Sequence, residues 1–399
     1  IGQGEIFVRS NKDAVNFRLF RLVGEELTEV IPHNPQTMLE AVQSFDGFLV
    51  LWESCDGLGQ VRFYSLATGE SRVLTFPDAT YELSFEANPS YELTEYRLNY
   101  SSPVTPNSVF SYDIETLERT VLKVQPVQGY EAKHYVCERI WVEASDGTQV
   151  PVSLARRKDA RGPIPILLYG YGSYGYSYPA GFRSTWISLF DRGVGIAIAH
   201  IRGGADLGRE WYLNGKMFRK MNTFTDFIAC ADHLVNQQYT TRENLGITGG
   251  SAGGLLMGAV LNLRPDLCRA CVARVPFVDV ISTMMDSSLP LTVIEYEEWG
   301  NPNEPEVYEY MLSYSPYDNV GTKEYPHLMV TAGLNDPRVG YWEPAKWVAR
   351  LRDRKQGDNL LIFRTHMGAG HGGESGRYGQ LRDLSWMFAF VLDRLRPQT

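Results

Sequence analysis

The chain has 399 residues, of which 44% are hydrophobic, 12% aromatic and 21% charged, and its formal net charge is −9. This length is enough for two domains with sizeable cores. The negative charge argues against nucleic acid as the main partner, and no apolar run is long enough to span a membrane. The five cysteines are an odd, sparse set, which favours a reducing, cytoplasmic compartment over a disulfide framework.

Residues 1–130 are predicted to form β-structure, because short alternating apolar and polar stretches are separated by Gly, Asp, Asn and Pro. One pattern of Tyr, Leu, Thr, Glu and Val-Leu at fixed spacing occupies Tyr64–Leu74 and returns with a closely similar residue at each position in Tyr112–Leu122. Each copy has the form of a hairpin. A period of about 40 to 50 residues with several strands is typical of a β-propeller blade. A β-sandwich with a coincidental repeat is the alternative.

The expected number of blades is too small for a closed ring. About three blades fit in 130 residues, whereas propellers close with about four to eight. An open arc of blades would expose sheet edges. The chain also begins with Ile1 and not with Met. We therefore expect the C-terminal part of a propeller, with the remaining blades on a separate N-terminal fragment or on a longer parent chain.

Residues 131–399 follow a different pattern, which predicts an α/β fold. A hairpin is expected around Asp146-Gly147, and unbroken apolar strands then alternate with amphipathic helices, as in a parallel sheet covered on both faces. The predicted strands are Ile164–Tyr169, Val194–His200, Leu245–Thr248, Ala270–Val275, His327–Ala332 and Leu360–Phe363. The predicted helices are Thr223–Gln238, Ala252–Leu263, Trp342–Arg354 and Gly376–Arg394.

The strand that ends at Thr248 is followed by Gly-Gly-Ser251-Ala-Gly-Gly and then by a helix. The pattern G-x-S-x-G between a strand and a helix is the nucleophile elbow, a tight turn that exposes the serine hydroxyl at the sheet edge. Glycine is needed beside the serine because a Cβ there would collide with the strand or the helix. Ser251 is therefore the predicted nucleophile of a serine hydrolase with the α/β-hydrolase fold.

A serine hydroxyl needs a base, and in this fold the acid and the histidine follow the serine in that order. Three histidines follow Ser251. His371 is the preferred base, because it lies in a glycine-rich loop just before the last helix. His366 belongs to a strand end and is the alternative, whereas His327 opens a strand and is poorly placed.

The acid is expected in the loop after the strand at 327–332. Asp336 lies in this loop and is preferred, since its carboxylate would hold the imidazole in the required tautomer. Capping of the turn before Pro337 is an alternative role for Asp336. Asp286 and Asp318 are the alternative acids.

The oxyanion hole needs two donors. The backbone N–H of Ala252, the residue after the nucleophile, is the first. The second is expected in the loop after an early strand, which has the sequence Tyr-Gly-Tyr-Gly-Ser-Tyr-Gly over residues 169–175. No His-Gly-Gly-Gly motif is present, so a tyrosine hydroxyl of this loop is the candidate donor.

An acidic segment, Glu295-Tyr-Glu297-Glu-Trp-Gly, lies between the elbow and Asp336. In an extended segment, Glu295 and Glu297 would project to the same side. Two neighbouring carboxylates gain from a shared cation, such as a Lys or Arg side chain of a substrate. On composition alone, a solvated acidic surface turn is favoured.

Together with Leu168–Gly172, His200–Gly204 and Asn335–Val339, these motifs resemble the prolyl oligopeptidase family of serine peptidases, over essentially the whole chain. Within the family, Glu295–Pro302 and Tyr314–Val320 are similar to the oligopeptidase B subfamily. The resemblance implies a triad with no metal and no organic cofactor. It also implies the individual site residues: Ser251, Asp336 and His371 in the triad, Tyr171 and Ala252 in the oxyanion hole, Arg338 at a substrate backbone carbonyl, and Glu295 and Glu297 at a P1 Lys or Arg.

The function expected from the residues and the resemblance together is a serine oligopeptidase that hydrolyses short basic peptides on the carboxyl side of Lys or Arg. The alternatives are a prolyl or acylaminoacyl peptidase of the same family and a non-catalytic propeller scaffold. Some bacterial members of the family carry a second acidic pair that favours a basic P2 residue. The matching segment here, Tyr176–Phe182, has no carboxylate, so no strong P2 preference is expected.

Overall fold

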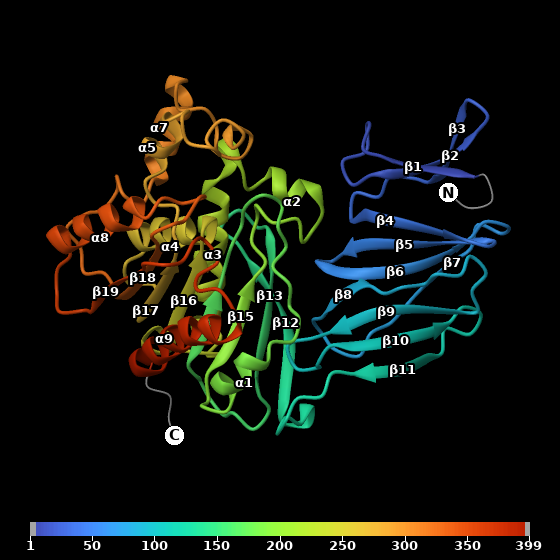
Figure 1. Ribbon diagram of the computed structural model, residues 1–399, viewed down its shortest axis with the longest axis horizontal. Coiled ribbons are helices and arrows are strands. Elements are labelled where there is room, and N and C mark those ends of the chain that lie inside the picture. Colours follow the sequence, from blue (N-terminus) through green and yellow to red (C-terminus); the bar gives the residue numbers. More distant parts are fainter. Residues whose placement is uncertain (1–4, 396–399) are drawn as a thin grey trace. The chain divides into compact units, whose positions relative to one another are not determined.

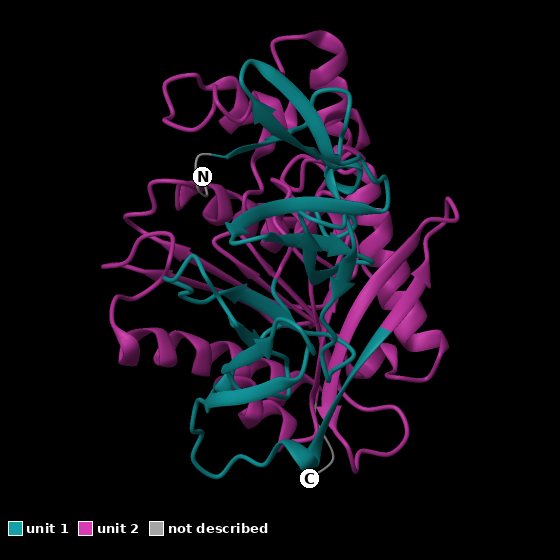
Figure 2. Ribbon diagram, turned by 90° about the vertical axis from the view of Figure 1, so that its right-hand side faces the viewer, with its two compact units in different colours: residues 1–139, 179–184, 205–212 teal, residues 140–178, 185–204, 213–399 magenta. Residues whose placement is uncertain are grey.

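The computed structural model describes residues 5–395, which group into two compact units (Figure 2). Unit 1 holds the described residues up to Arg139 together with residues 179–184 and 205–212. Unit 2 holds residues 140–178, residues 185–204 and the described residues from Leu213 onward. Unit 1 thus includes two short segments from the later part of the chain, and the proposed domain boundary at residue 130 stays a prediction.

Unit 1 contains three successive antiparallel sheets (Figure 1). The first has the order β1-β2-β3, the second β4-β5-β6-β7 and the third β11-β10-β9-β8. The strands are β1 (Ile6–Ser10), β2 (Arg18–Val23), β3 (Glu26–Ile31), β4 (Thr37–Phe45), β5 (Phe48–Cys55), β6 (Leu58–Ser65), β7 (Ser71–Val73), β8 (Glu82–Phe85), β9 (Glu95–Ser101), β10 (Ser108–Asp113) and β11 (Arg119–Val124).

The three sheets pack face to face, as propeller blades do. Successive side chains of a strand point to opposite faces, so β5 can serve two cores at once. Its Leu49 and Leu51 pack with residues of the first sheet, whereas Val50 and Trp52 pack with the aromatic residues of the third. The two copies of the sequence repeat become the hairpins β6–β7 and β10–β11. The propeller prediction is therefore confirmed.

The second half of the chain builds an eight-stranded sheet with the order β12-β13-β15-β14-β16-β17-β18-β19. The strand β13 pairs with β15 antiparallel, and the pairs from β15 to β19 are parallel. The strands are β12 (Tyr135–Glu143), β13 (Gln149–Arg157), β14 (Ile166–Tyr169), β15 (Gly195–Ala199), β16 (Leu245–Gly250), β17 (Ala270–Arg274), β18 (His327–Gly333) and β19 (Leu361–His366).

Helices lie on both sides of this sheet (Figure 1), which explains why its central strands are apolar throughout. The α/β prediction is therefore confirmed. The α-helices are α1 (Ser184–Phe190), α2 (Arg209–Leu213), α3 (Met221–Asn236), α4 (Ala252–Leu263), α5 (Val280–Met285), α6 (Tyr296–Trp299), α7 (Pro305–Tyr314), α8 (Trp342–Arg354) and α9 (Arg377–Leu395). Short 3-10 helices occupy Ala132–His134, Met217–Arg219 and Arg242–Asn244. No helix among the described residues is long and apolar enough to cross a membrane.

Candidate active site

Ser251 stands at the junction between β16 and α4 in a strained backbone conformation. Its φ is +57° and its ψ is −120°, a region that residues other than glycine rarely adopt. Hydrogen bonds hold this conformation on both sides. The Ser251 N–H donates to the carbonyl of Arg274 at 2.9 Å, and the Ser251 carbonyl accepts from the Gly254 N–H at 2.8 Å. The turn has the geometry expected of a nucleophile elbow.

The glycines beside Ser251 are needed for close backbone packing. A Cβ on Gly253 would lie 2.7 Å from the carbonyl oxygen of Gly170, nearer than real Cβ contacts come. A Cβ on Gly249 would meet the carbonyl oxygen of Gly253, and one on Gly254 would meet Pro276. The strand, the turn and the helix therefore fit together only without these side chains.

His371 and Asp336 form a hydrogen-bonded pair. The His371 Nδ1 lies 2.7 Å from the Asp336 Oδ2. The other carboxylate oxygen, Oδ1, accepts the backbone N–H groups of Arg338 and Val339 at 2.9 and 3.0 Å. Asp336 thus caps its own turn and holds the imidazole, so both roles weighed from the sequence are present.

Asp336 is ionised although its side chain is fully buried. Burial by itself would raise the pKa of Asp336, but the hydrogen bonds from His371, Val339 and Arg338 outweigh burial and lower this pKa below its ordinary value. An ionised carboxylate at this place would stabilise a positive charge on the imidazole of His371.

One cavity of about 520 Å³ brings most of the predicted site together. The predicted site residues that line it are Tyr171, Ser251, Ala252, Glu295, Asp336 and Arg338. His371 does not line the cavity, but it is hydrogen-bonded to Asp336, which does. Among the described residues, no hydrogen bond joins His371 to the Ser251 hydroxyl. Such bonds are often long or unformed in free enzymes.

The alternative bases and acids are engaged elsewhere. His327 accepts the backbone N–H of Leu360 at 2.8 Å, and burial lowers its pKa to about 4. Asp286 accepts the hydroxyl of Ser288 at 2.6 Å, and Asp318 accepts a serine hydroxyl at the same distance. His366 lies near two carboxylates outside this cavity.

The loop after β14 places two tyrosines at the cavity. Gly172 and Tyr174 have φ values of +71° and +61°, so the chain turns sharply between them. Burial, followed by the nearby carboxylates of Glu298 and Glu295, raises the pKa of Tyr171 to about 12. The Tyr171 hydroxyl therefore keeps its proton near neutral pH and can donate a hydrogen bond to an oxyanion.

The acidic segment is helical, so the expectation of an extended segment was wrong. The helix α6 begins directly after Glu295, and residues two positions apart on a helix face different sides. Glu295 lines the cavity, whereas Glu297 is exposed and does not. The Glu295 Oε2 accepts the Tyr174 hydroxyl at 3.0 Å and the Trp299 Nε1–H at 2.8 Å.

Two buried charged residues that were not predicted from the sequence, Lys220 and Glu298, lie under the tyrosine loop. The Lys220 ammonium donates to the carbonyl oxygen of Gly172 at 2.6 Å and to the Ser173 hydroxyl at 2.7 Å. A Glu298 carboxylate oxygen accepts the Tyr174 N–H at 3.0 Å. Burial lowers the pKa of Lys220 to about 8, and the charge of Glu298 opposes this shift. The two charges fix the loop that carries Tyr171.

Comparisons with known proteins agree with this geometry. A model described as the prolyl oligopeptidase family matches residues 180–398. A second one, described as the N-terminal β-propeller domain of prolyl oligopeptidase, matches residues 2–125. The chain belongs to the prolyl oligopeptidase family of serine peptidases.

Relatives in this family match nearly the whole chain. A protein named dipeptidyl aminopeptidase BI from Pseudoxanthomonas mexicana is 46% identical over 97% of this chain and 55% of its own length. Protease 2 from Moraxella lacunata is 42% identical over 98% of this chain and 58% of its own length. Among solved structures, oligopeptidase B from Trypanosoma brucei with covalently bound antipain superposes with a TM-score of 0.92. It is 42% identical over 100% of this chain and 59% of its own.

The chain thus spans somewhat more than half the length of the relatives that it matches. The same holds for oligopeptidase B from Leishmania major, with a TM-score of 0.91 and 40% identity over 99% of this chain and 57% of its own. In these relatives the additional length belongs to the same polypeptide. The expectation of a separate N-terminal fragment as partner is therefore unsupported.

Proposed function

We propose that this chain is a serine oligopeptidase that hydrolyses short peptides on the carboxyl side of Lys or Arg. The observation that carries the proposal is the shared cavity, in which the strained Ser251, the buried Asp336 and the carboxylate of Glu295 lie together. A nucleophile with its orienting acid supports acyl transfer, and a carboxylate in the same cavity supports recognition of a cation.

In the proposed reaction, the Ser251 Oγ attacks the carbonyl carbon of the scissile peptide bond and gives its proton to the Nε2 of His371. His371 Nδ1 is already bound by Asp336, so Nε2 is the nitrogen that faces the substrate once the loop brings it to Ser251. The same proton then passes to the leaving amine, and the acyl group stays on Ser251. Water hydrolyses this ester through the same base.

The negative oxygen of the tetrahedral intermediate is held in the proposal by the Ala252 N–H and the Tyr171 hydroxyl. Each such donor is typically worth about 10² to 10³ in kcat. Arg338 lines the same cavity, where its guanidinium is available to a carbonyl of the substrate backbone. The oxyanion and the backbone carbonyl thus have separate donors.

Glu295 is the proposed partner of the P1 side chain. Hydrogen bonds from Tyr174 and Trp299 fix one of its oxygens, so the carboxylate is held in place before substrate binds. Glu297 is retained as the second carboxylate, but its exposed position limits it to a screened, longer-range attraction.

The test compares blocked peptide amides with Arg or norleucine at P1. Glu295→Gln keeps the shape and is expected to lower kcat/KM for the Arg substrate about 10- to 100-fold, mainly through KM, and to leave the norleucine substrate within about threefold. Glu297→Gln is the matched control, with less than about threefold loss on either substrate. Equal losses on both substrates in Glu295→Gln would refute charge recognition. Faster cleavage of Pro- or acyl-blocked substrates would favour the other family activities.

A second candidate is removal of dipeptides from free N-termini, which the name of the Pseudoxanthomonas mexicana relative suggests. The Glu295 carboxylate would suit the α-amine of a peptide as well as a P1 side chain. Blocking the N-terminus of an otherwise identical Arg substrate separates the two activities. The oligopeptidase proposal predicts that the blocked peptide is cleaved, and the dipeptidyl proposal predicts that it is not.

The proposal includes a cytoplasmic location and short basic peptides as the binding partners. All five cysteines are free, and four of them are buried, which fits a reducing compartment. The limit to short peptides follows from the resemblance to the family and not from the cavity.

A further inference from the structure

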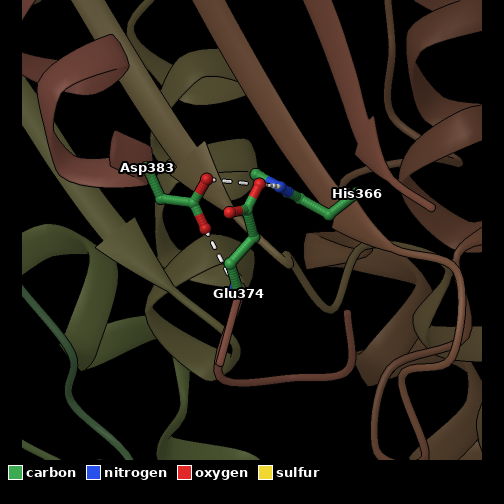
Figure 3. A group of neighbouring side chains, drawn as sticks. All are labelled: His366, Glu374 and Asp383. Atoms are coloured by element: carbon green, nitrogen blue, oxygen red, sulfur yellow. Dashed lines mark hydrogen bonds and ion pairs between the residues drawn. The ribbon is translucent and has the colours of Figure 1, made fainter. Parts of the chain in front are cut away.

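A second group of chemically capable side chains lies outside the candidate active site (Figure 3). It contains His366 at the end of β19, Glu374 in the following loop and Asp383 on α9. The ligand atoms of the three side chains lie within 4.8 Å of one another. The His366 Nδ1 is 3.3 Å from the Asp383 Oδ1 and 3.9 Å from the Glu374 Oε1.

The three side chains point toward one another (Figure 3). The His366 side chain is only 9% exposed, and its ring makes no hydrogen bond with any described residue. The Asp383 Oδ1 is buried and accepts no hydrogen bond, although the Asp383 Oδ2 accepts the Glu374 N–H at 3.0 Å. A buried carboxylate oxygen without a donor is costly unless a cation supplies the missing interaction.

Two arginines lie at the edge of this cluster. The Arg364 Nη1 is 3.5 Å from the Asp383 Oδ1, and the Arg382 Nη1 is 3.9 Å from the Glu374 Oε2. Both are ion pairs, but their separations exceed those of charge-assisted hydrogen bonds, about 2.7 to 2.9 Å. The Arg364 guanidinium also lies over the ring of Trp386. The arginines reduce the negative charge of the cluster.

We propose that His366, Glu374 and Asp383 bind one divalent transition-metal ion, with Zn²⁺ the best match. Zinc takes imidazole nitrogen and carboxylate oxygen at about 2.0 to 2.2 Å, so two tetrahedral ligands lie about 3.4 Å apart. The separations of 3.3 and 3.9 Å from the imidazole nitrogen are close to this value, and all three ligand atoms lie within 4.8 Å of one another. The imidazole favours zinc over Mg²⁺ and Ca²⁺, which prefer oxygen ligands.

The site would connect the two ends of the loop that carries His371. His366 comes just before this loop, Glu374 follows Gly373 near the end of the loop, and Asp383 belongs to the helix that follows. The loop already contacts the turn that carries Asp336, since the Asn335 N–H donates to the Ala369 carbonyl at 3.0 Å. A bound ion would therefore restrain the loop at both ends, away from the catalytic atoms.

The test is titration of the metal-free 399-residue chain with ZnCl₂ in a calorimeter. The expected result is one ion per chain, weakened at least about tenfold by Asp383→Asn. Asp393→Asn is the matched control, because Asp393 lies on the same helix but is exposed and paired with Arg394. Binding should persist in a His371→Ala variant, which removes the nearby catalytic imidazole as a ligand.

A second readout is hydrogen exchange. Zinc should slow the exchange of amides in residues 367–376 of the wild type but not of the Asp383→Asn variant. Glu374→Gln serves in place of Asp383→Asn if circular dichroism shows that the latter does not fold. Equal zinc affinity in Asp383→Asn and Asp393→Asn would overturn the proposal, as would binding that is lost in His371→Ala but kept in Asp383→Asn. Both outcomes leave the peptidase proposal untouched.

Discussion

At Asp336 the charge of the side chain can be removed while its shape is kept, by substitution with Asn. Its carboxylate accepts three hydrogen bonds while fully buried. Asp336→Asn keeps an oxygen acceptor for the two backbone N–H groups but presents an uncharged NH2 group, a donor, to the His371 Nδ1. We expect kcat to fall roughly 10³- to 10⁴-fold with KM little changed. Asp318→Asn, at the alternative acid, should lose less than about threefold, and the reverse order of losses would assign the acid to Asp318.

The buried Glu343 is expected to make the free energy of unfolding of the chain depend on pH. Burial raises its pKa to about 8, from 4.5. Between these values the unfolded chain releases a proton that the folded chain keeps, so the free energy of unfolding falls as pH rises from about 4.5 to 8. Glu343→Gln cannot ionise and should match the wild type near pH 5 but exceed it by about 1 to 3 kcal/mol at pH 8. Urea unfolding at both pH values measures the difference, and parallel curves would contradict the argument.

The sequence could predict single residues where a local motif determines the role. Ser251 can be recognised from its neighbouring glycines and from the strand and helix that flank it. The glycine-rich loop around His371 is recognisable in the same local way. Lys220 had no such signal, because a lysine before a helix is usually solvated. Its burial depends on contacts with Gly172 and Ser173, 48 and 47 residues away in sequence.

At the scale of elements, the turn from β16 into α4 depends on backbone packing. Gly253→Ala would place a methyl group 2.7 Å from the Gly170 carbonyl oxygen. We expect the variant to lose about 2 kcal/mol or more of stability and most of its activity. Gly372→Ala adds the same methyl group where nothing lies within 4 Å, so it is the control for stability. Thermal unfolding of the two variants measures the contrast, and equal midpoints would contradict the packing argument.

Element boundaries were predicted well where the apolar pattern was long, as in α4 and β18, and poorly where the element was short. The four residues of α6 are fewer than two turns, so periodicity could not distinguish a helix from an extended segment. That difference changed which carboxylates face the cavity: Glu295 lines it, Glu297 is exposed outside it, and Glu298 is buried against the tyrosine loop.

At the scale of the whole molecule, β11 is an edge strand that exposes apolar side chains. Val121, Leu122 and Val124 are each about half exposed, and β11 pairs only with β10 among the described strands. Such an edge favours association between copies. Val124→Lys should reduce light scattering of the concentrated chain. Leu263→Lys adds the same charge at an exposed position of α4 and should leave the light scattering unchanged. Equal reductions of light scattering in the two variants would show that the added charge, and not the edge of β11, causes the reduction.

The architecture as a whole was predictable because the two halves of the chain follow different sequence patterns. Alternating short stretches with a long-period repeat indicated blades, and unbroken apolar strands separated by helices indicated the parallel sheet. The inclusion of residues 179–184 and 205–212 in unit 1 was not predictable, since it arises from contacts distant in sequence.

The proposed activation of Ser251 by His371 is tested most directly by the rate at which a fluorophosphonate modifies the chain, with the modified residue identified by mass spectrometry. We expect one adduct, on Ser251, whose formation is abolished by Ser251→Ala and slowed at least about 10³-fold by His371→Ala. An adduct on another residue, or an unchanged rate in His371→Ala, would contradict this activation.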